Sequence, residues 1–227
     1  MIPLFIIILW RNYRKSKTAS ALRLKNLKSF AMIAAPLMLA LLSLSFTPHA
    51  QEQLLHYDVF HKGEIKGQVL IRKNITGKQV HIKIESEVKV RFLLLITVRS
   101  IEEAIFEDDV LLFSSLYRTV NGDEKINRQL QAKGVTYNMK DKDNAANVPA
   151  YPIHNSILSL YYKEPVNINS IYSDNFQQYV DIKKVDTNKY RVSFPNGHCN
   201  YYSYAQGVCT RVDVEQPLFN LQFLLNR

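Results

Sequence analysis

A strict alternation of apolar and polar side chains over Gln79–Val90 constrains the fold more than any other feature of this chain. The apolar residues of the segment are Val80, Ile82, Ile84, Val88 and Val90. The polar residues between them are His81, Lys83, Glu85, Glu87 and Lys89. Because successive side chains of a β-strand point to opposite faces of a sheet, the pattern predicts a strand with one buried face and one solvated face.

Shorter strand signals recur along the rest of the chain. They are Leu54–Phe60, Gly67–Lys73, Val110–Thr119, Ile126–Ala132, Tyr179–Val185, Tyr190–Phe194, Cys199–Tyr204, Val208–Glu215 and Phe219–Leu225. Turns such as Asn121-Gly122 and Gln206-Gly207 separate them, and connections this short make neighbouring strands antiparallel. We therefore predict an all-β protein whose antiparallel up-and-down sheet is curved into a barrel or half-barrel. The reason is that about a dozen strands are more than an open twisted sheet usually accommodates.

Two segments depart from the strand pattern. Apolar residues at helical spacing begin at Ile153, and Pro165 follows them, which predicts one short helix covering an open end or face of the sheet. Lys140–Asn147 lacks any large apolar side chain, so we predict a mobile loop there and the one plausible internal boundary.

Residues 1–50 have the layout of a leader. The uncharged apolar run 30–46 follows a basic segment and precedes Ala50, which predicts a signal peptide with its apolar core at 30–46 and a single β-rich domain over 51–227. The domain would then be exported to the periplasm or the extracellular space. The run has 17 residues, the lower edge of a membrane span, so a membrane-anchored protein with an uncleaved anchor helix is the alternative. The extra apolar and basic residues before the run suggest a translation start downstream of Met1.

The net charge of +9 comes mostly from the leader. Residues 1–50 contain seven Lys and Arg and no acid, which leaves 22 Lys and Arg against 20 Asp and Glu in the rest. A nucleic-acid partner is therefore not predicted, and contact with a membrane is expected only through an uncleaved leader.

Several short motifs together suggest a family. They are Tyr57-Asp58-Val59-Phe60, Lys62-Gly63-Glu64, Gly67, Val88-Lys89-Val90-Arg91-Phe92, Phe194-Pro195-Asn196-Gly197, Tyr204 and Gly207-Val208-Cys209. With them the chain resembles, over most of residues 54–225, a bacterial family of domains of unknown function, number 6134 in that series. The resemblance implies a secreted or periplasmic β-rich domain. It implies no activity and no catalytic residues.

Motifs of enzymes and cofactor sites are missing from the sequence. It has no glycine-rich phosphate loop, Gly-x-Ser-x-Gly, His-Glu-x-x-His or Cys-x-x-Cys, so we predict no cofactor, no metal and no catalytic residue. His198 and Cys199 are adjacent, and in a strand their side chains would diverge. The acidic residues Glu102, Glu103, Glu107, Asp108 and Asp109 could bind calcium or act as an acid and base pair, but they lack ligand spacing, so a strand end and a hairpin turn are expected.

The two cysteines are predicted to stay unpaired. A two-residue hairpin at Gln206-Gly207 places Cys209 opposite Tyr204 and Cys199 opposite Val214. The thiols would then stand about 16 Å apart, beyond the reach of a disulfide.

Aromatic side chains are the remaining candidates for a binding site. The residues that could line a cavity for an apolar, lipid-like ligand or a glycan are Phe92, Tyr161, Tyr162, Tyr201, Tyr202 and Tyr204. The alternative is that these aromatics simply fill the core of the sheet.

Three function classes remain open. The first is an exported binding module that holds a lipid or a glycan, the second a structural or envelope-interaction protein without a ligand, and the third an unrecognised hydrolase. An open cavity lined by Phe and Tyr would favour the first, a filled interior the second, and two convergent buried carboxylates the third.

Overall fold

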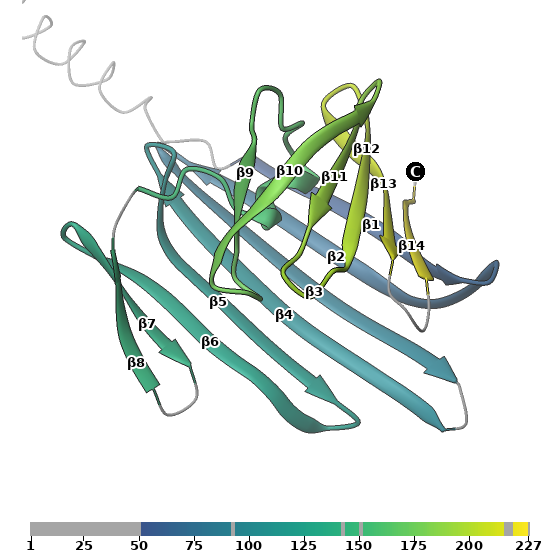
Figure 1. The fold of residues 1–227 in the computed structure, drawn as a ribbon. Coiled ribbons are helices and arrows are strands. Elements are labelled where there is room, and N and C mark those ends of the chain that lie inside the picture. The colour runs from purple at the N-terminus through teal and green to yellow at the C-terminus, as the bar shows by residue number, and fades with distance from the viewer. Residues whose placement is uncertain (1–50, 92–93, 142–143, 150–151, 216–219, 227) are drawn as a thin grey trace, which may run out of the picture. The chain divides into compact units, whose positions relative to one another are not determined.

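The computed structural model describes residues 51–91, 94–141, 144–149, 152–215 and 220–226, and the predicted leader lies outside them. One antiparallel sheet of 14 strands dominates this part of the chain (Figure 1). The first eight strands are β1 (Gln51–His61), β2 (Glu64–Thr76), β3 (Gln79–Arg91), β4 (Leu95–Glu107), β5 (Val110–Val120), β6 (Asp123–Lys133), β7 (Thr136–Asp141) and β8 (Asn144–Pro149). The other six are β9 (Ser170–Ser173), β10 (Gln178–Asp186), β11 (Lys189–Ser193), β12 (Cys199–Ala205), β13 (Val208–Glu215) and β14 (Asn220–Leu225).

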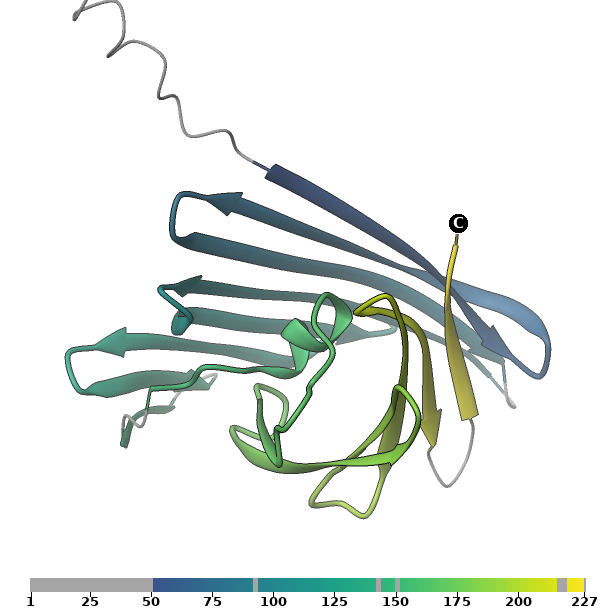
Figure 2. The same cartoon turned by 90° about the horizontal axis from the view of Figure 1, so that it is seen from above.

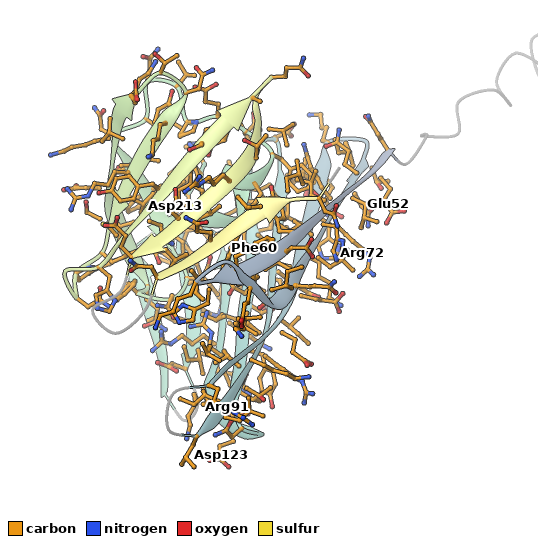
Figure 3. The ribbon with its side chains drawn as sticks, turned by 90° about the vertical axis from the view of Figure 1, so that its right-hand side faces the viewer. Glu52, Phe60, Arg72, Arg91, Asp123 and Asp213 are labelled. Atoms are coloured by element: carbon orange, nitrogen blue, oxygen red, sulfur yellow. The ribbon has the colours of Figure 1, made fainter. Side chains whose placement is uncertain are left out.

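The first and the last strand meet in the middle of the sheet. β1 pairs with β2 on one side and with β14 on the other, so that Tyr57 is opposite Leu225 and Val59 is opposite Phe223. Figure 3 shows this side of the molecule, with Arg72 of β2 and Asp213 of β13 labelled on either side of the join. Two up-and-down runs, β1–β8 and β9–β14, are therefore joined into one sheet by the pairing of the chain's ends.

The sheet is curved but does not close. Its two edges are β8 and β9, which follow each other in the sequence and yet do not pair. The segment that connects them runs between two strands instead. The Leu111 amide donates to the carbonyl of Ile153 at 2.8 Å, and the Tyr172 amide donates to the carbonyl of Asn155 at 3.0 Å. The expected curvature is confirmed, and the closed-barrel form of the prediction is corrected to an open sheet.

The strand predicted from alternation is confirmed. It forms β3, whose side chains Ile82 and Ile84 are 3% and 6% exposed, and Ile84 lies opposite Ile71 of β2. The face of the sheet that carries these residues is called the inner face below. The tight turns also form as expected. At one of them Asn121 and Gly122 have φ values of 54° and 91°, and glycine adopts such positive values without strain.

One prediction of local structure is confirmed in shortened form and one is wrong. The predicted short helix forms as the 3₁₀ helix η1 (Ile157–Tyr161), which begins after Ile153 and Asn155 because the carbonyls of these two residues accept hydrogen bonds from strand residues. The predicted loop Lys140–Asn147 instead contributes Lys140 and Asp141 to β7 and residues 144–147 to β8, and these strands pair antiparallel. No helix within the described residues is long and apolar enough to cross a membrane.

The hairpin of the two cysteines forms with a shifted register. Cys209 lies opposite Tyr204, as expected, but an irregularity between Ser203 and Tyr204 places Cys199 opposite Glu215 rather than Val214. Both cysteines are buried and free.

The helix η1 lies inside the curl of the sheet, between β1–β5 and β9–β13 (Figure 2). Its residues Leu158, Leu160 and Tyr161 are 2%, 1% and 7% exposed. They pack into a continuous core with apolar side chains from nearly every strand of the inner face. The short segment after β8 thus supplies the centre of the core.

Candidate functional site

Three of the predicted ligand-binding tyrosines belong to the core. Tyr161 contacts Tyr57 and Tyr202 edge to face, with ring centroids 5.5 Å and 6.2 Å apart. The hydroxyl of Tyr204 donates to the carbonyl of Leu160 at 2.8 Å, which ties β12 to η1. Burial raises the pKa of Tyr161, Tyr202 and Tyr204 well above the usual range, so these rings stay neutral and packed.

The other three predicted residues do not join them in one site. Tyr162 is half-buried and its hydroxyl lies 3.0 Å from the carbonyl oxygens of both Gln53 and Ile71. Tyr201 alternates with the buried Tyr202 on β12 and therefore lies on the opposite face, with the ammonium of Lys189 5.2 Å from its ring centroid. Phe92 lies outside the described residues.

The acidic residues at the end of β4 are also dispersed. Asp108 and Asp109 form the hairpin turn with positive φ values of 48° and 61°, as expected for a turn. Glu103 and Glu102 point to opposite faces, and Glu102 pairs with Arg118 on the inner face. Across the described residues, no group of three or more His, Cys, Asp or Glu is arranged to hold a metal ion.

His198 and Cys199 bond to different partners. Nδ1 of His198 lies 3.1 Å from Nδ2 of Asn196, within the turn before β12. The Cys199 thiol donates to Oε2 of Glu215 at 3.3 Å. The imidazole of His198 therefore does not act as the hydrogen-bond partner of the Cys199 thiol.

A polar cluster that the sequence did not indicate lies under the turn between β9 and β10. The turn carries Asp174 and Asn175 and is closed by a 3.2 Å hydrogen bond from the Phe176 amide to the carbonyl of Ser173. Its last residue, Gln177, has a φ of 56°, a left-handed conformation in which glycine is more usual. This turn lies against the inner face of β5 and β6, where Ser114 and Arg128 meet it.

Hydrogen bonds from two strands, β5 and β6, hold the turn in place. The hydroxyl of Ser114 donates to Oδ1 of Asp174 at 2.5 Å, and both groups are buried. Asn175 accepts from Arg118 at its side-chain oxygen, at 3.2 Å, and from Arg128 at its carbonyl, at 2.5 Å. Each of these guanidinium groups also pairs with a carboxylate. Arg118 pairs with Glu102 at 3.2 Å, and Arg128 pairs with Asp141 at 3.1 Å.

The carboxyl group of Asp174 titrates near neutrality. Burial raises its pKa to about 7; the hydrogen bond from Ser114 opposes this rise and the charge of Glu102 adds to it. Its second oxygen, Oδ2, is buried and has no hydrogen-bond partner, and the same is true of Nε2 of Gln177. An uncompensated buried polar atom costs about 1–3 kcal/mol, so this part of the molecule has unused hydrogen-bonding capacity.

Asp174 and Gln177 line a small half-open pocket together with Ser114, Ser115, Leu116, Arg128, Gln129, Leu130, Met139 and Tyr172. Its internal volume of about 10 Å³ is the space of about one water molecule. The pocket can therefore hold one hydroxyl-sized group. Sequence reasoning missed it because its walls come from β5–β7, β9 and the turn after β9, which are far apart in the sequence.

Comparisons with known proteins bear on the family and the fold. A family model described as a domain of unknown function, DUF6134, matches residues 57–226. The crystal structure of a beta-barrel-like protein of domain of unknown function DUF1849 from Brucella abortus is similar with a TM-score of 0.48 and 9% sequence identity. The likeness covers 78% of this chain and 96% of that one. No curated protein matches the chain.

Proposed function

The chain belongs to the DUF6134 family, whose description assigns no activity, and we propose that it is an exported structural or interaction protein of the cell envelope that carries no apolar ligand. The observation that supports this function is that, among the residues that the structure describes, η1 and the core side chains fill the space inside the curved sheet. Of the function classes that the sequence left open, a filled interior favours this one.

The residues of η1 occupy the volume that a lipid carrier would need. Leu158, Leu160 and Tyr161 insert between the two halves of the sheet and are almost fully buried. The hydrogen bonds from Tyr204 to Leu160 and from Tyr162 to Gln53 and Ile71 anchor the C-terminal end of this segment. Removing it to admit a ligand would break these bonds and expose the core, which is costly because interiors pack at near-crystalline density.

The carboxylates argue against a hydrolase. The charge of Glu102 contributes to the raised pKa of Asp174. Glu102 itself is paired with Arg118 and accepts a 3.1 Å hydrogen bond from the hydroxyl of Ser100. Glu102 and Arg118 therefore form an ion pair whose charges are compensated within the protein without a substrate.

Export is proposed from the sequence, since the leader lies outside the described residues. The apolar run 30–46 and Ala50 support a mature protein that begins near Gln51. N-terminal sequencing of the protein from fractionated cells tests this step. A protein that retains the run and stays with the membranes would show the segment to be an anchor.

The ligand-free interior is tested on protein purified from its native envelope. Organic extraction and mass spectrometry should find no lipid in stoichiometric amount. The apolar dye anilinonaphthalene sulfonate should not bind the folded protein, whereas a Tyr161→Ala variant, with a cavity in place of the ring, should bind it. A stoichiometric lipid would overturn the proposal and favour the binding-module class.

The envelope role is tested in cells. A strain without the gene should become more sensitive to detergent. The full chain should restore resistance, and a variant without residues 1–50, which stays in the cytoplasm, should not. Unchanged sensitivity, or rescue by the unexported variant, would contradict the role.

A further inference from the structure

The pocket at Asp174 differs from the interior because it is half-open and has polar side chains among its lining residues. Its walls combine β5, β6 and β7 with β9 and the turn that follows it. Asp174 is 8% exposed and lines this pocket, and its Oδ2 atom is buried without a hydrogen-bond partner. This inference rests on the pocket alone and does not depend on the proposed function.

The two unpaired atoms have complementary requirements. Oδ2 of Asp174 accepts a hydrogen bond when the carboxyl group is ionised, and Nε2 of Gln177 donates one. A hydroxyl group can donate to the first and accept from the second. While Asp174 is ionised, a carboxylate has no proton to donate to it, and an ammonium group cannot accept from Gln177.

The neighbouring arginines are paired with carboxylates of the protein, so these side chains offer no unpaired charge to an ionic ligand. Arg128 is paired with Asp141 and also donates to the carbonyl of Asn175. Arg118 is paired with Glu102 and donates to the side chain of Asn175. The guanidinium groups are thus committed to the protein, and the pocket favours a neutral, hydroxyl-bearing ligand.

An exposed aromatic ring packs against one of the pocket residues. Tyr179 of β10 is 46% exposed, and its ring packs edge to face against Tyr172, a pocket residue, with centroids 5.9 Å apart. Sugar rings present apolar C–H faces that pack on aromatic rings, while their hydroxyls form hydrogen bonds. The pocket admits only one hydroxyl-sized group, so the rest of a sugar would lie outside it and could pack on an exposed ring such as that of Tyr179.

The backbone at Gln177 allows a substitution that does not strain the fold. This residue adopts a φ of 56°, a left-handed conformation that other turn residues of the chain, such as Lys62 and Asn188, share. A glycine there would relax the backbone and remove the side chain.

We propose that the Asp174 pocket binds one hydroxyl group of a neutral oligosaccharide whose ring packs on Tyr179. In this complex the ligand hydroxyl donates to Asp174 and accepts from Gln177. The partner class of the site is therefore a glycan.

Saturation-transfer NMR on the mature protein tests the site, with cellotriose, maltotriose and tri-N-acetylglucosamine as probes at millimolar concentration. At least one probe should bind. Tyr179→Ala and Gln177→Gly should each weaken that binding by about tenfold. Gln177→Gly relieves the strained φ, so it should fold at least as stably as the original chain, and its loss of binding cannot be attributed to unfolding.

Tyr117→Ala is the matched control. Tyr117 is 40% exposed, close to the value for Tyr179, but it alternates with the buried Leu116 on β5 and does not line the pocket. This variant should bind the probe as the original chain does. The proposal is overturned if none of the three probes binds, or if Tyr117→Ala weakens binding as much as Tyr179→Ala.

Discussion

Ser114 and Asp174, which are 60 residues apart in the sequence, share a buried hydrogen bond of 2.5 Å between the serine hydroxyl and Oδ1 of the carboxyl group. The bond joins β5 to the turn after β9, on opposite sides of the curl. It satisfies only one oxygen of the carboxyl group, and burial therefore still dominates its titration. The charged groups around this site are Glu102 of β4, Arg118 of β5, Arg128 of β6 and Asp141 of β7.

Asp174 should make the protein less stable as the pH rises. Its pKa is raised from 3.8 to about 7 on folding, so the folded state retains a proton that the unfolded state has released. The stability from this proton is fully present below about pH 4 and is lost as the pH rises through about 7. Between about pH 5 and pH 8 the free energy of unfolding should fall by about 2–3 kcal/mol.

Urea unfolding of the original chain and of Asp174→Asn at both pH values measures this effect. The asparagine cannot titrate, so its free energy of unfolding should lose this part of the pH dependence. Parallel pH profiles for the two proteins would show that Asp174 is already ionised in the fold.

Removing the hydroxyl of Tyr204 should destabilise the core. Tyr204→Phe leaves the buried carbonyl of Leu160 without its 2.8 Å partner, at an expected cost of about 1–3 kcal/mol. Tyr117→Phe on the exposed surface should change stability by less than about 0.5 kcal/mol. Denaturant melts compare the two. Equal midpoints would mean that η1 is not held by Tyr204.

The two faces of β3 should respond differently to truncation. Ile84→Ala removes a side chain that is 6% exposed and should cost about 2–5 kcal/mol. Lys83→Ala breaks only half-exposed ion pairs, at 3.0 Å to Glu85 and 3.9 Å to Glu103, and should cost less than about 0.5 kcal/mol. Chemical denaturation measures both variants, and similar losses would contradict the register of the strand.

Gly67 should not tolerate a side chain. It lies on the inner face of β2, and a Cβ atom there would overlap the backbone carbonyl of Glu87 on β3. Gly67→Ala should therefore destabilise by about 1–3 kcal/mol, because the two strands must separate. Gly77→Ala is the control, since a Cβ at that turn meets nothing and only its φ of 59° is strained. A thermal melt in which Gly67→Ala is the milder change would refute the close approach of β2 and β3.

Both thiols should be free and slow to react. The cysteines are unpaired in the structure, and burial raises the pKa of Cys209 to about 12, so its reactive thiolate is scarce at neutral pH. A thiol reagent should count two thiols in denatured, unreduced protein and react slowly with Cys209 in the native state. A count of zero in a monomer would require a Cys199 to Cys209 bridge and a different C-terminal hairpin.

Only the tertiary structure shows where the aromatic candidates lie. Tyr161, Tyr202 and Tyr204 were candidates for a ligand site, and all three are buried in the core, Tyr161 within η1 and the other two on β12. Composition cannot separate these outcomes, because a cavity wall and a core use the same side chains. The difference lies in whether another segment fills the space inside the sheet. Here that segment is η1, which contacts Tyr57 although about a hundred residues of chain separate the two.

The sequence by itself determined what depends on neighbours along the chain. The alternation in β3 decides which side chains face the core, and the Asn121-Gly122 turn decides that β5 and β6 are antiparallel. These features have a local cause, because two-residue periodicity and a positive φ are properties of a few consecutive residues. Only the tertiary structure decided that β1 pairs with β14, that β8 and β9 stay apart, and that Asp174 meets Ser114. Those contacts depend on the curvature of the whole sheet. The interactions of all strands together, rather than those of any one strand, determine that curvature.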